Sequence, residues 1–423
     1  MRRYESYKAS GLEWLGDIPA DWTLKKSKFL WREREDRSLL GDEELLSVSQ
    51  YVGIVPRADE SRSESLEDYK KCQPDDLVIN IMLAWMGGLG VSNHSGIVSP
   101  AYCVYRQLEN HNPQYLGYLY RTTQYLAEFA RRSKGVVPSR WRMYTEDFGQ
   151  VLTVLPPRAE QDRIVNFLDQ KNSEIDAAIA KKERLIELLQ EQKSILISQA
   201  VTRGLIPNVS TWDSGAKWFG KVPTHWSVLP LRRVSRFVRT GRTPPSSSKF
   251  SGFEDGNIPW FTPGDFQEDC CFEGASRLVN QRAIDHGHVD LYPERSLYFI
   301  GIGATLGKVC FSAQKASCNQ QINVIGLTDE HDPLFFAFQL NSARRAIFRL
   351  AEYTTMPILN QSGTKAILVA IPPYLEQKEI TAHIRLVSDH FRKIKMAQED
   401  EIKSLRELRA VLVSDVVSGK IRV

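Results

Sequence analysis

Two long stretches of the chain place hydrophobic residues at the seven-residue spacing of paired helices. From Glu160 to about Val201 the chain has neither Pro nor Gly, and Lys or Glu fills much of the space between the apolar positions. The apolar positions of this stretch include Leu168, Ile175, Ile179, Ile186, Leu189 and Leu196. Those of a second stretch, near the C-terminus, include Ile384, Phe391, Ile394, Leu405 and Leu412. The two ladders predict two coiled-coil helices, because a seven-residue repeat keeps one apolar seam facing a partner.

Each predicted helix needs a partner for its apolar seam, and the other helix of the same chain is the nearest one. We therefore predict an antiparallel coiled coil within the chain, with globular parts at its two ends. Packing of each helix on its own globular domain, or on a separate subunit, remains an open alternative. Gly204 and Gly419 are expected to end the helices, since glycine readily adopts the left-handed conformation that follows a last helical turn.

The rest of the chain is predicted to form two compact domains of mixed helix and strand. Short apolar runs at 76–80, 296–300 and 322–325 predict strands, and 114–131 and 333–350 predict helices. The fold class is therefore α+β or α/β, with two globular domains separated by the two long helices. The predicted boundaries are 1–155 and 205–370 for the globular domains, 156–204 for the central helix and 371–423 for the C-terminal helix.

The borders of the two globular segments repeat each other. The pattern S-G-x-x-W-[LF]-G-x-[IV]-P-x-x-W occupies residues 10–22 and 214–226, and [LI]-P-P-x-x-E-Q occupies 155–161 and 371–377. The interiors differ, so the frame is duplicated and its contents are not. We interpret the repeated tryptophans as packing or partner anchors, because residues that read different targets should differ between the halves. These tryptophans are Trp14, Trp22, Trp218 and Trp226.

Composition narrows the class of protein without identifying a ligand. The 423 residues are 42% hydrophobic and 25% charged, which is typical of a globular protein with two to three domains. The net charge of +4 is not an argument for nucleic acid. The six cysteines form no CxxC pair and no zinc-ligand pattern, so we expect reduced thiols and no metal site. No signal peptide or membrane-length apolar run is apparent, so we expect a cytoplasmic protein without a membrane partner.

Two motifs that suggest enzymatic chemistry are better explained as structure. The glycine-rich run 299–307 resembles a nucleotide-binding turn, but the residues after it read as another strand, so we predict a hairpin. Ile371-Pro372-Pro373-Tyr374 resembles an amino-methyltransferase motif, but isoleucine cannot accept the hydrogen bonds of a target amino group. Proline there suits the start of a helix. We expect no catalytic residues.

Cations and amides in the dissimilar interiors are suited to contacts with DNA. Arg can bind phosphate or guanine, and Asn or Gln can bind adenine in the major groove. The candidates are Lys134, Arg140, Trp141, Arg142, Arg239, Arg242, Thr243, Asn319, Gln320, Gln321, Asn360 and Gln361. Each could equally be a surface cation or a turn residue that satisfies backbone groups.

The duplicated motifs, the run Val98-Ser99-Pro100-Ala101-Tyr102 and the glycine turn 301–308 together resemble the specificity subunit of type I restriction–modification systems. The resemblance covers essentially the whole chain. It implies two target-recognition domains that each read one half of a bipartite DNA site, joined by helices that act as a ruler. Because the interiors of 25–150 and 230–365 align poorly, the two half-sites are expected to differ.

The resemblance also implies partners that carry out the chemistry. Two modification subunits would methylate N6 of adenine with S-adenosylmethionine, and restriction subunits with motor and nuclease activity would use ATP and Mg. This chain itself is expected to bind no cofactor. Two alternatives remain: a stand-alone DNA adenine methyltransferase, and a coiled-coil scaffold that does not bind DNA.

Overall fold

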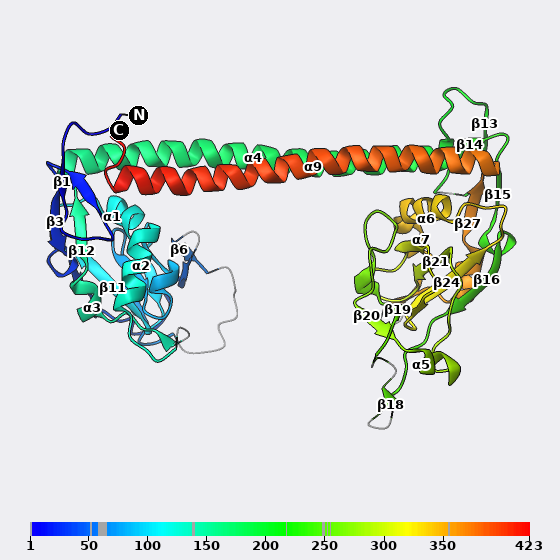
Figure 1. Ribbon diagram of the computed structural model, residues 1–423, viewed down its shortest axis with the longest axis horizontal. Helices are drawn as coiled ribbons and strands as arrows, with labels where there is room; N and C mark the ends of the chain where they lie inside the picture. The colour runs from blue at the N-terminus through cyan, green and yellow to red at the C-terminus, as the bar shows by residue number, and fades with distance from the viewer. Residues whose placement is uncertain are drawn as a thin grey trace. The chain divides into compact units, whose positions relative to one another are not determined.

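The computed structural model describes residues 2–50, 53–57, 66–137, 140–216, 218–247, 250–251, 253, 255–353 and 356–423. The chain forms two compact units. The first comprises Met1–Lys182 and Glu399–Val423, and the second comprises Glu183–Gln398. Each unit contains one globular lobe and one half of each long helix (Figure 1). The predicted domains kept each helix whole, and their boundaries stay a prediction.

The two long helices are α4 (Arg158–Arg203) and α9 (Tyr374–Val417). Both follow a Pro-Pro pair, which suits a helix start because proline lacks the N–H that an interior turn requires. Gly204 and Gly419 follow their last turns with φ of 75° and 80°, which confirms the predicted stops.

Within each unit, segments of the two helices lie side by side and run antiparallel (Figure 1). In the first unit, ion pairs link Lys182 to Glu401 and Asp176 to Arg409. The seam residues Ile175 and Ile179 are buried there. The predicted antiparallel coiled coil is thus confirmed. The alternative of packing on a lobe also holds in part, because Leu168 and Leu412 belong to the core of the first lobe and Ile384 to that of the second.

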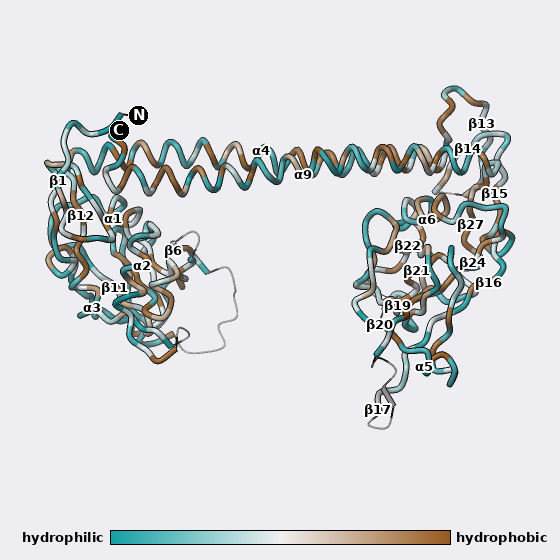
Figure 2. Tube along the Cα trace, viewed as in Figure 1, coloured by the Kyte–Doolittle hydropathy of each residue, from teal (hydrophilic) through white to brown (hydrophobic). Residues whose placement is uncertain are grey.

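The seam is less complete in the second unit. Ile186, Leu189 and Phe391 are half-buried, and Leu196 is 36% exposed. Apolar and polar residues alternate along both helices (Figure 2).

The first lobe is built on a four-stranded antiparallel sheet of order β4-β11-β8-β9. Two further pairs, β1 with β2 and β3 with β12, are formed by the repeated border segments. Its strands are β1 (Tyr7–Ala9), β2 (Asp17–Pro19), β3 (Thr23–Lys26), β4 (Trp31–Glu33), β5 (Leu46–Ser49), β6 (Gly53–Pro56), β7 (Lys70–Cys72), β8 (Leu77–Asn80), β9 (Leu89–Val91), β10 (Gly96–Val98), β11 (Tyr102–Gln107) and β12 (Leu152–Leu155). Its helices are η1 (Ser27–Phe29), η2 (Ala84–Met86), α1 (Pro113–Tyr120), α2 (Thr123–Arg132) and α3 (Thr145–Gly149).

The second lobe repeats this plan with a sheet of order β16-β24-β21-β22 and the border pairs β13 with β14 and β15 with β27. Its strands are β13 (Thr211–Asp213), β14 (Lys221–Pro223), β15 (Ser227–Pro230), β16 (Ser235–Thr240), β17 (Ser246–Ser247), β18 (Phe250–Ser251), β19 (Ile258–Phe261), β20 (Arg277–Val279), β21 (Ser296–Ile300), β22 (Val309–Ser312), β23 (Ser317–Cys318), β24 (Ile322–Leu327), β25 (Glu352–Tyr353), β26 (Pro357–Ile358) and β27 (Leu368–Ile371). Its helices are η4 (Leu231–Arg233), η5 (Pro263–Asp265), α5 (Gln281–Asp285), α6 (Pro333–Ser342), α7 (Arg344–Phe348) and α8 (Gln361–Ala366).

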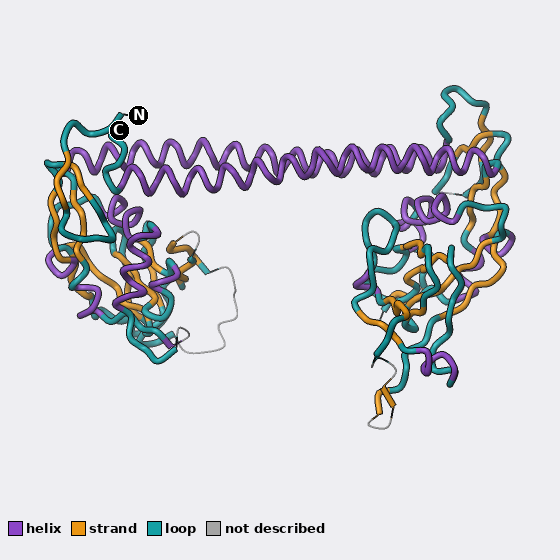
Figure 3. Tube along the Cα trace, in the orientation of Figure 1, coloured by secondary structure: helices purple, strands orange, loops and turns teal. Residues whose placement is uncertain are grey.

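The predicted strands are confirmed as β8, β21 and β24, and each lobe mixes helix and strand (Figure 3). Each predicted lobe helix is instead a pair of helices. The first breaks at Thr122, whose extended backbone (φ −71°, ψ 152°) starts α2 anew. The second breaks at Ala343. The glycine-rich run after β21 is the predicted hairpin, since β21 and β22 pair as antiparallel neighbours.

Candidate functional site

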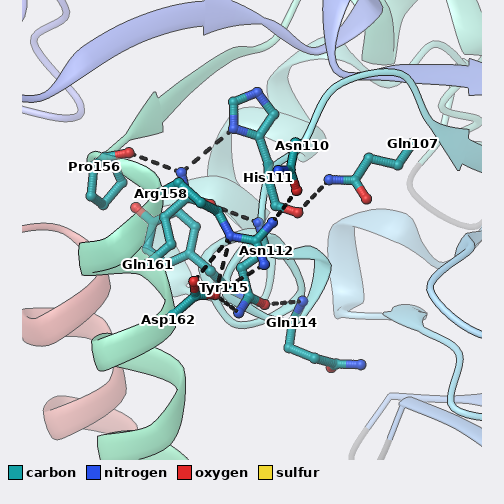
Figure 4. Close-up of polar contacts among 10 residues, drawn as sticks. All are labelled: Gln107, Asn110, His111, Asn112, Gln114, Tyr115, Pro156, Arg158, Gln161 and Asp162. Atoms are coloured by element: carbon teal, nitrogen blue, oxygen red, sulfur yellow. Dashed lines mark hydrogen bonds and ion pairs between the residues drawn. The ribbon is translucent and has the colours of Figure 1, made fainter.

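The repeated border residues join each lobe to the start of a long helix. In the first unit, Trp22 is fully buried and its Nε1 donates to Oε2 of Glu160, at 3.3 Å. Gln161 sits beside it: its Nε2 donates to the Pro156 carbonyl at 2.8 Å, and its Oε1 accepts from the backbone N–H of Asn112 at 2.8 Å (Figure 4). One glutamine thus ties the end of β12, the start of α4 and the start of α1 together.

The second unit repeats this joint. Trp226 Nε1 donates to Oε1 of Glu376 at 3.1 Å, and Gln377 Nε2 donates to the Pro372 carbonyl at 2.8 Å. Oε1 of Gln377 accepts from the backbone N–H of Asp332, the first residue before α6, at 2.9 Å. The E-Q pair of the repeated motif is therefore a structural joint.

The glycine that ends each long helix packs against the tryptophan that is hydrogen-bonded to the first turn of the other long helix. A Cβ on Gly419 would lie 2.5 Å from Pro19 and 3.1 Å from Trp22. A Cβ on Gly204 would lie 3.0 Å from the Glu376 carboxylate and 3.3 Å from Trp226. The buried Trp22 and Trp226 thus serve packing within their units. Trp14 and Trp218 are half-buried against Tyr125 and Phe219, and a partner role for these tryptophans stays a prediction.

Three of the predicted segments meet at one edge of the second lobe: loop 239–243, turn 319–321 and the start of α8. The backbone N–H of Arg242 donates to the Cys318 carbonyl at 2.9 Å, and the Thr243 hydroxyl donates to Oε1 of Gln320. The Gln361 amide lies 3.0 Å from the Thr240 hydroxyl. These residues come from distant parts of the chain, so only the fold brings them together.

The chemistry of this edge is polar and cationic. Arg239, Arg242, Thr243, Gln320 and Asn360 are exposed. Arg239 lies over the Phe237 ring at 5.6 Å, and Arg242 pairs with Asp290 at 3.4 Å. The buried Asn319 bonds to Gln321 at 3.0 Å and shapes the turn, while Asn360 Oδ1 accepts from the Gly363 N–H and starts α8. For Asn319, turn formation is therefore the observed role. Roles in DNA binding stay predictions for the whole set.

Sequence reasoning missed Asn323, which holds this edge together. It is buried on β24, and its Oδ1 accepts from the Thr240 hydroxyl at 2.8 Å. Its Nδ2 donates to the Leu359 carbonyl at 3.1 Å and lies 2.9 Å from the Thr364 hydroxyl. An amide inside an otherwise apolar strand was the available signal, because a buried polar side chain is normally held by hydrogen bonds.

In the first unit, the predicted residues form a separate loop, 134–142. The backbones of Lys134 and Arg142 exchange two hydrogen bonds of 2.9 Å. Lys134 also pairs with Asp147 at 2.9 Å, and Trp141 packs edge-on against Trp85 at 5.4 Å. Arg140 is exposed and, among the described residues, its side chain has no hydrogen bond or ion pair.

The end of β4 in the first unit is comparable to the end of β16 but carries acids. Arg34 pairs with Asp36 at 2.7 Å and with Asp76 at 2.9 Å. Burial raises the pKa of Asp76 despite Arg34. Burial opposes ionisation of Glu33, but hydrogen bonds from Thr145 and Lys70 outweigh it and lower its pKa. Arg34 and Lys70 are thus each paired with carboxylates.

The described residues offer neither a metal-binding cluster nor a membrane-spanning helix. Among the described residues, no group of three or more His, Cys, Asp or Glu side chains could hold a metal ion. No helix in the described part of the chain is long and apolar enough to span a bilayer. All six cysteines are free thiols.

Comparison with known proteins identifies the fold and one domain of the chain. Residues 223–404 match the type I restriction modification DNA specificity domain. A putative type I restriction enzyme MjaX specificity subunit of Methanocaldococcus jannaschii is 24% identical over 273 residues, 64% of this chain and 59% of that protein. The MjaIX specificity subunit of the same organism is 24% identical over 186 residues, 43% of this chain and 42% of that protein. The matches thus span about half the length of these relatives.

Two solved structures share the fold over nearly the whole chain. The first, from work on complex assembly and conformational transition of the type I R-M system, has a TM-score of 0.69 at 14% identity, covering 96% of this chain and 99% of the other. The second is the HsdS subunit of Thermoanaerobacter tengcongensis, with a TM-score of 0.54 at 15% identity, covering 96% and 98%. The chain thus shares the fold of these two structures, and residues 223–404 are similar to the type I restriction modification DNA specificity domain.

Proposed function

We propose that this chain reads the sequence of double-stranded DNA for a type I restriction–modification complex. The observation that carries the proposal is the meeting of loop 239–243, turn 319–321 and Asn360–Gln361 at one edge of the second lobe. Two arginines suit phosphates or guanine, and the amides of Gln320 and Asn360 suit adenine. Asn323 would hold these groups in register behind the reading edge.

The first unit would read a different sequence with different residues. Its candidates lie in segment 134–142, whereas Arg34 at the end of β4 is already paired with Asp36 and Asp76. Two unlike reading surfaces on one repeated frame support a bipartite site with two unlike halves. The paired helices α4 and α9 would set the number of unread base pairs between the halves.

The chemistry would belong to partner chains. Two modification subunits would bind S-adenosylmethionine and methylate adenine, and restriction subunits would use ATP and Mg, while this chain would have no catalytic activity. A protein that reads the grooves leaves the target amino group inside the base stack, so a separate chain must extrude the base. The second-unit part of α4 offers a docking surface, because Leu185, Leu188 and Ile195 are about half exposed there.

The test is a DNA-binding assay of the chain assembled with its modification subunits. Binding should discriminate the methylated motif of the host from a scrambled duplex, and Arg242→Ala should weaken it. Indifference to sequence would favour the scaffold without DNA. Transfer of labelled methyl groups by the purified chain alone would favour the stand-alone methyltransferase.

A further inference from the structure

Two valines of the first unit stand in solvent on the loop that carries its predicted DNA contacts. Val136 is 97% exposed and Val137 is 43% exposed. Exposure of adjacent aliphatic side chains costs hydration free energy, and clustered exposed apolar groups commonly mark a binding surface.

The loop backbone holds the valines outward. The bridge between Lys134 and Arg142 closes the loop, and the Arg140 N–H donates to the Val137 carbonyl at 2.8 Å. The backbone of Arg140 passes close to Gly135. A Cβ added to Gly135 would lie 2.5 Å from the carbonyl oxygen of Arg140. The valines therefore lie next to the bridge between Lys134 and Arg142, and the neighbouring Trp141 packs on Trp85.

The charges around the valines identify the kind of partner. Arg131 and Arg132 share the single carboxylate of the buried Glu128, which leaves one positive charge on this group, and Lys134 pairs with Asp147. Arg140 keeps its charge at the exposed end of the loop. An apolar tip flanked by an unneutralised arginine suits a nucleic acid, whose bases are apolar on their faces and whose backbone is anionic.

The second unit also has an exposed apolar side chain, at the equivalent position in its order of elements. Its hairpin of β25 and β26 also lies between the second lobe helix and the short helix that follows, and Met356 there is 53% exposed. The backbone of Pro357 accepts from the Gly303 N–H at 3.1 Å, and Asn360 follows shortly after. An exposed aliphatic side chain thus adjoins the predicted reading residues in both units.

We propose that Val136 and Val137 form a wedge that enters a base step of the half-site read by the first unit, with Arg140 on the adjacent phosphate. The wedge would partly unstack that step, and the energy of unstacking would make the first unit sensitive to bases it does not hydrogen-bond. This inference rests on the proposed function.

The experiment uses the chain assembled with its modification subunits. The duplexes carry the fluorescent adenine analogue 2-aminopurine at successive positions of each half-site, excluding the methylated adenine, which the modification subunit would itself extrude. We expect the parental complex to raise the fluorescence at one step of one half-site. V136S/V137S should abolish that rise and weaken cognate binding about tenfold.

Matched variants separate the wedge from other effects. L39S/L40S removes another exposed aliphatic pair of the same unit (Leu39 and Leu40, 84% and 77% exposed) and should leave fluorescence and affinity unchanged. Arg140→Ala should lower the slope of log affinity against log salt by about 0.9, the value for one phosphate contact, whereas V136S/V137S should leave that slope unchanged.

The outcomes are distinguishable. If the parental complex does not discriminate cognate DNA, the proposed function fails. If it does, but V136S/V137S behaves like the parent or instead loses its partner subunits, the wedge alone is overturned.

Discussion

At the end of β4 in the first unit, Arg34 pairs with Asp36 and Asp76. At the end of β16 in the second unit, Arg239 and Arg242 are exposed, and Arg242 pairs with Asp290. Behind these edges, both units use the same joint of tryptophan, glutamate and glutamine. A duplicated frame can therefore keep its joints while its edges diverge. This is what two readers of unlike sequences require.

The largest effects should come from the shared frame, and they should be similar in both units. Trp22→Ala and Trp226→Ala each remove a buried indole together with its hydrogen bond to Glu160 or Glu376. We expect each to lower the free energy of unfolding by roughly 3–5 kcal/mol, measured by urea denaturation of the full chain. A large effect in one unit only would contradict the equivalence of the frames.

The two glycines that end the long helices, Gly204 and Gly419, should differ in how much stability is lost when each is replaced. Both need φ near 75–80°, which costs a residue with a side chain of order 1–3 kcal/mol. Gly419→Ala should cost more than Gly204→Ala, because its Cβ would lie 2.5 Å from the Pro19 ring, whereas the nearest atom to a Gly204 Cβ is 3.0 Å away. Thermal unfolding of the two variants measures the difference, and equal losses would refute the explanation.

Asn323→Val should affect reading more than folding. It removes the hydrogen bonds that Asn323 makes with the Thr240 hydroxyl, the Thr364 hydroxyl and the Leu359 carbonyl, so the reading segments lose their register. We expect about tenfold less discrimination against single mismatches in one half-site, equivalent to about 1.4 kcal/mol. Methylation rates of mismatched duplexes by the complete complex provide the measurement.

The control for Asn323 is Cys103→Val on β11. The Cys103 thiol lies 3.6 Å from the Thr145 hydroxyl, and thiols form weak hydrogen bonds, so discrimination in the other half-site should change little. A uniform loss of methylation at all sites by Asn323→Val, matched or mismatched, would point to a folding defect instead.

The smallest effects should come from single surface charges, and they should differ in sign. Arg242→Ala should weaken DNA binding severalfold, Asp290→Asn should strengthen nonspecific binding by removing a competing anion, and Arg34→Ala should change it little. Fluorescence anisotropy at several salt concentrations measures all three. Equal losses for Arg34→Ala and Arg242→Ala would contradict the asymmetry of the edges.

The frame was predictable because its residues are repeated. Duplicated Trp22 and Trp226, seven-residue ladders and terminal glycines each leave a pattern that one sequence displays twice. The meeting of Arg242, Gln320 and Gln361 was not predictable, since strand order, not spacing along the chain, brings them together. Pairing of Lys134 with Asp147 was equally hidden, because a run of cations says nothing of the acids that fold against it.

The most direct test of two unlike readers on one frame is methylome sequencing of a host that carries the complete system, with the parental chain and with Arg242→Ala/Asn323→Val. We predict a motif of two different defined sequences separated by undefined bases, with the double variant relaxing one half only. A single uninterrupted motif, two identical halves, or relaxation of both halves together would contradict the account.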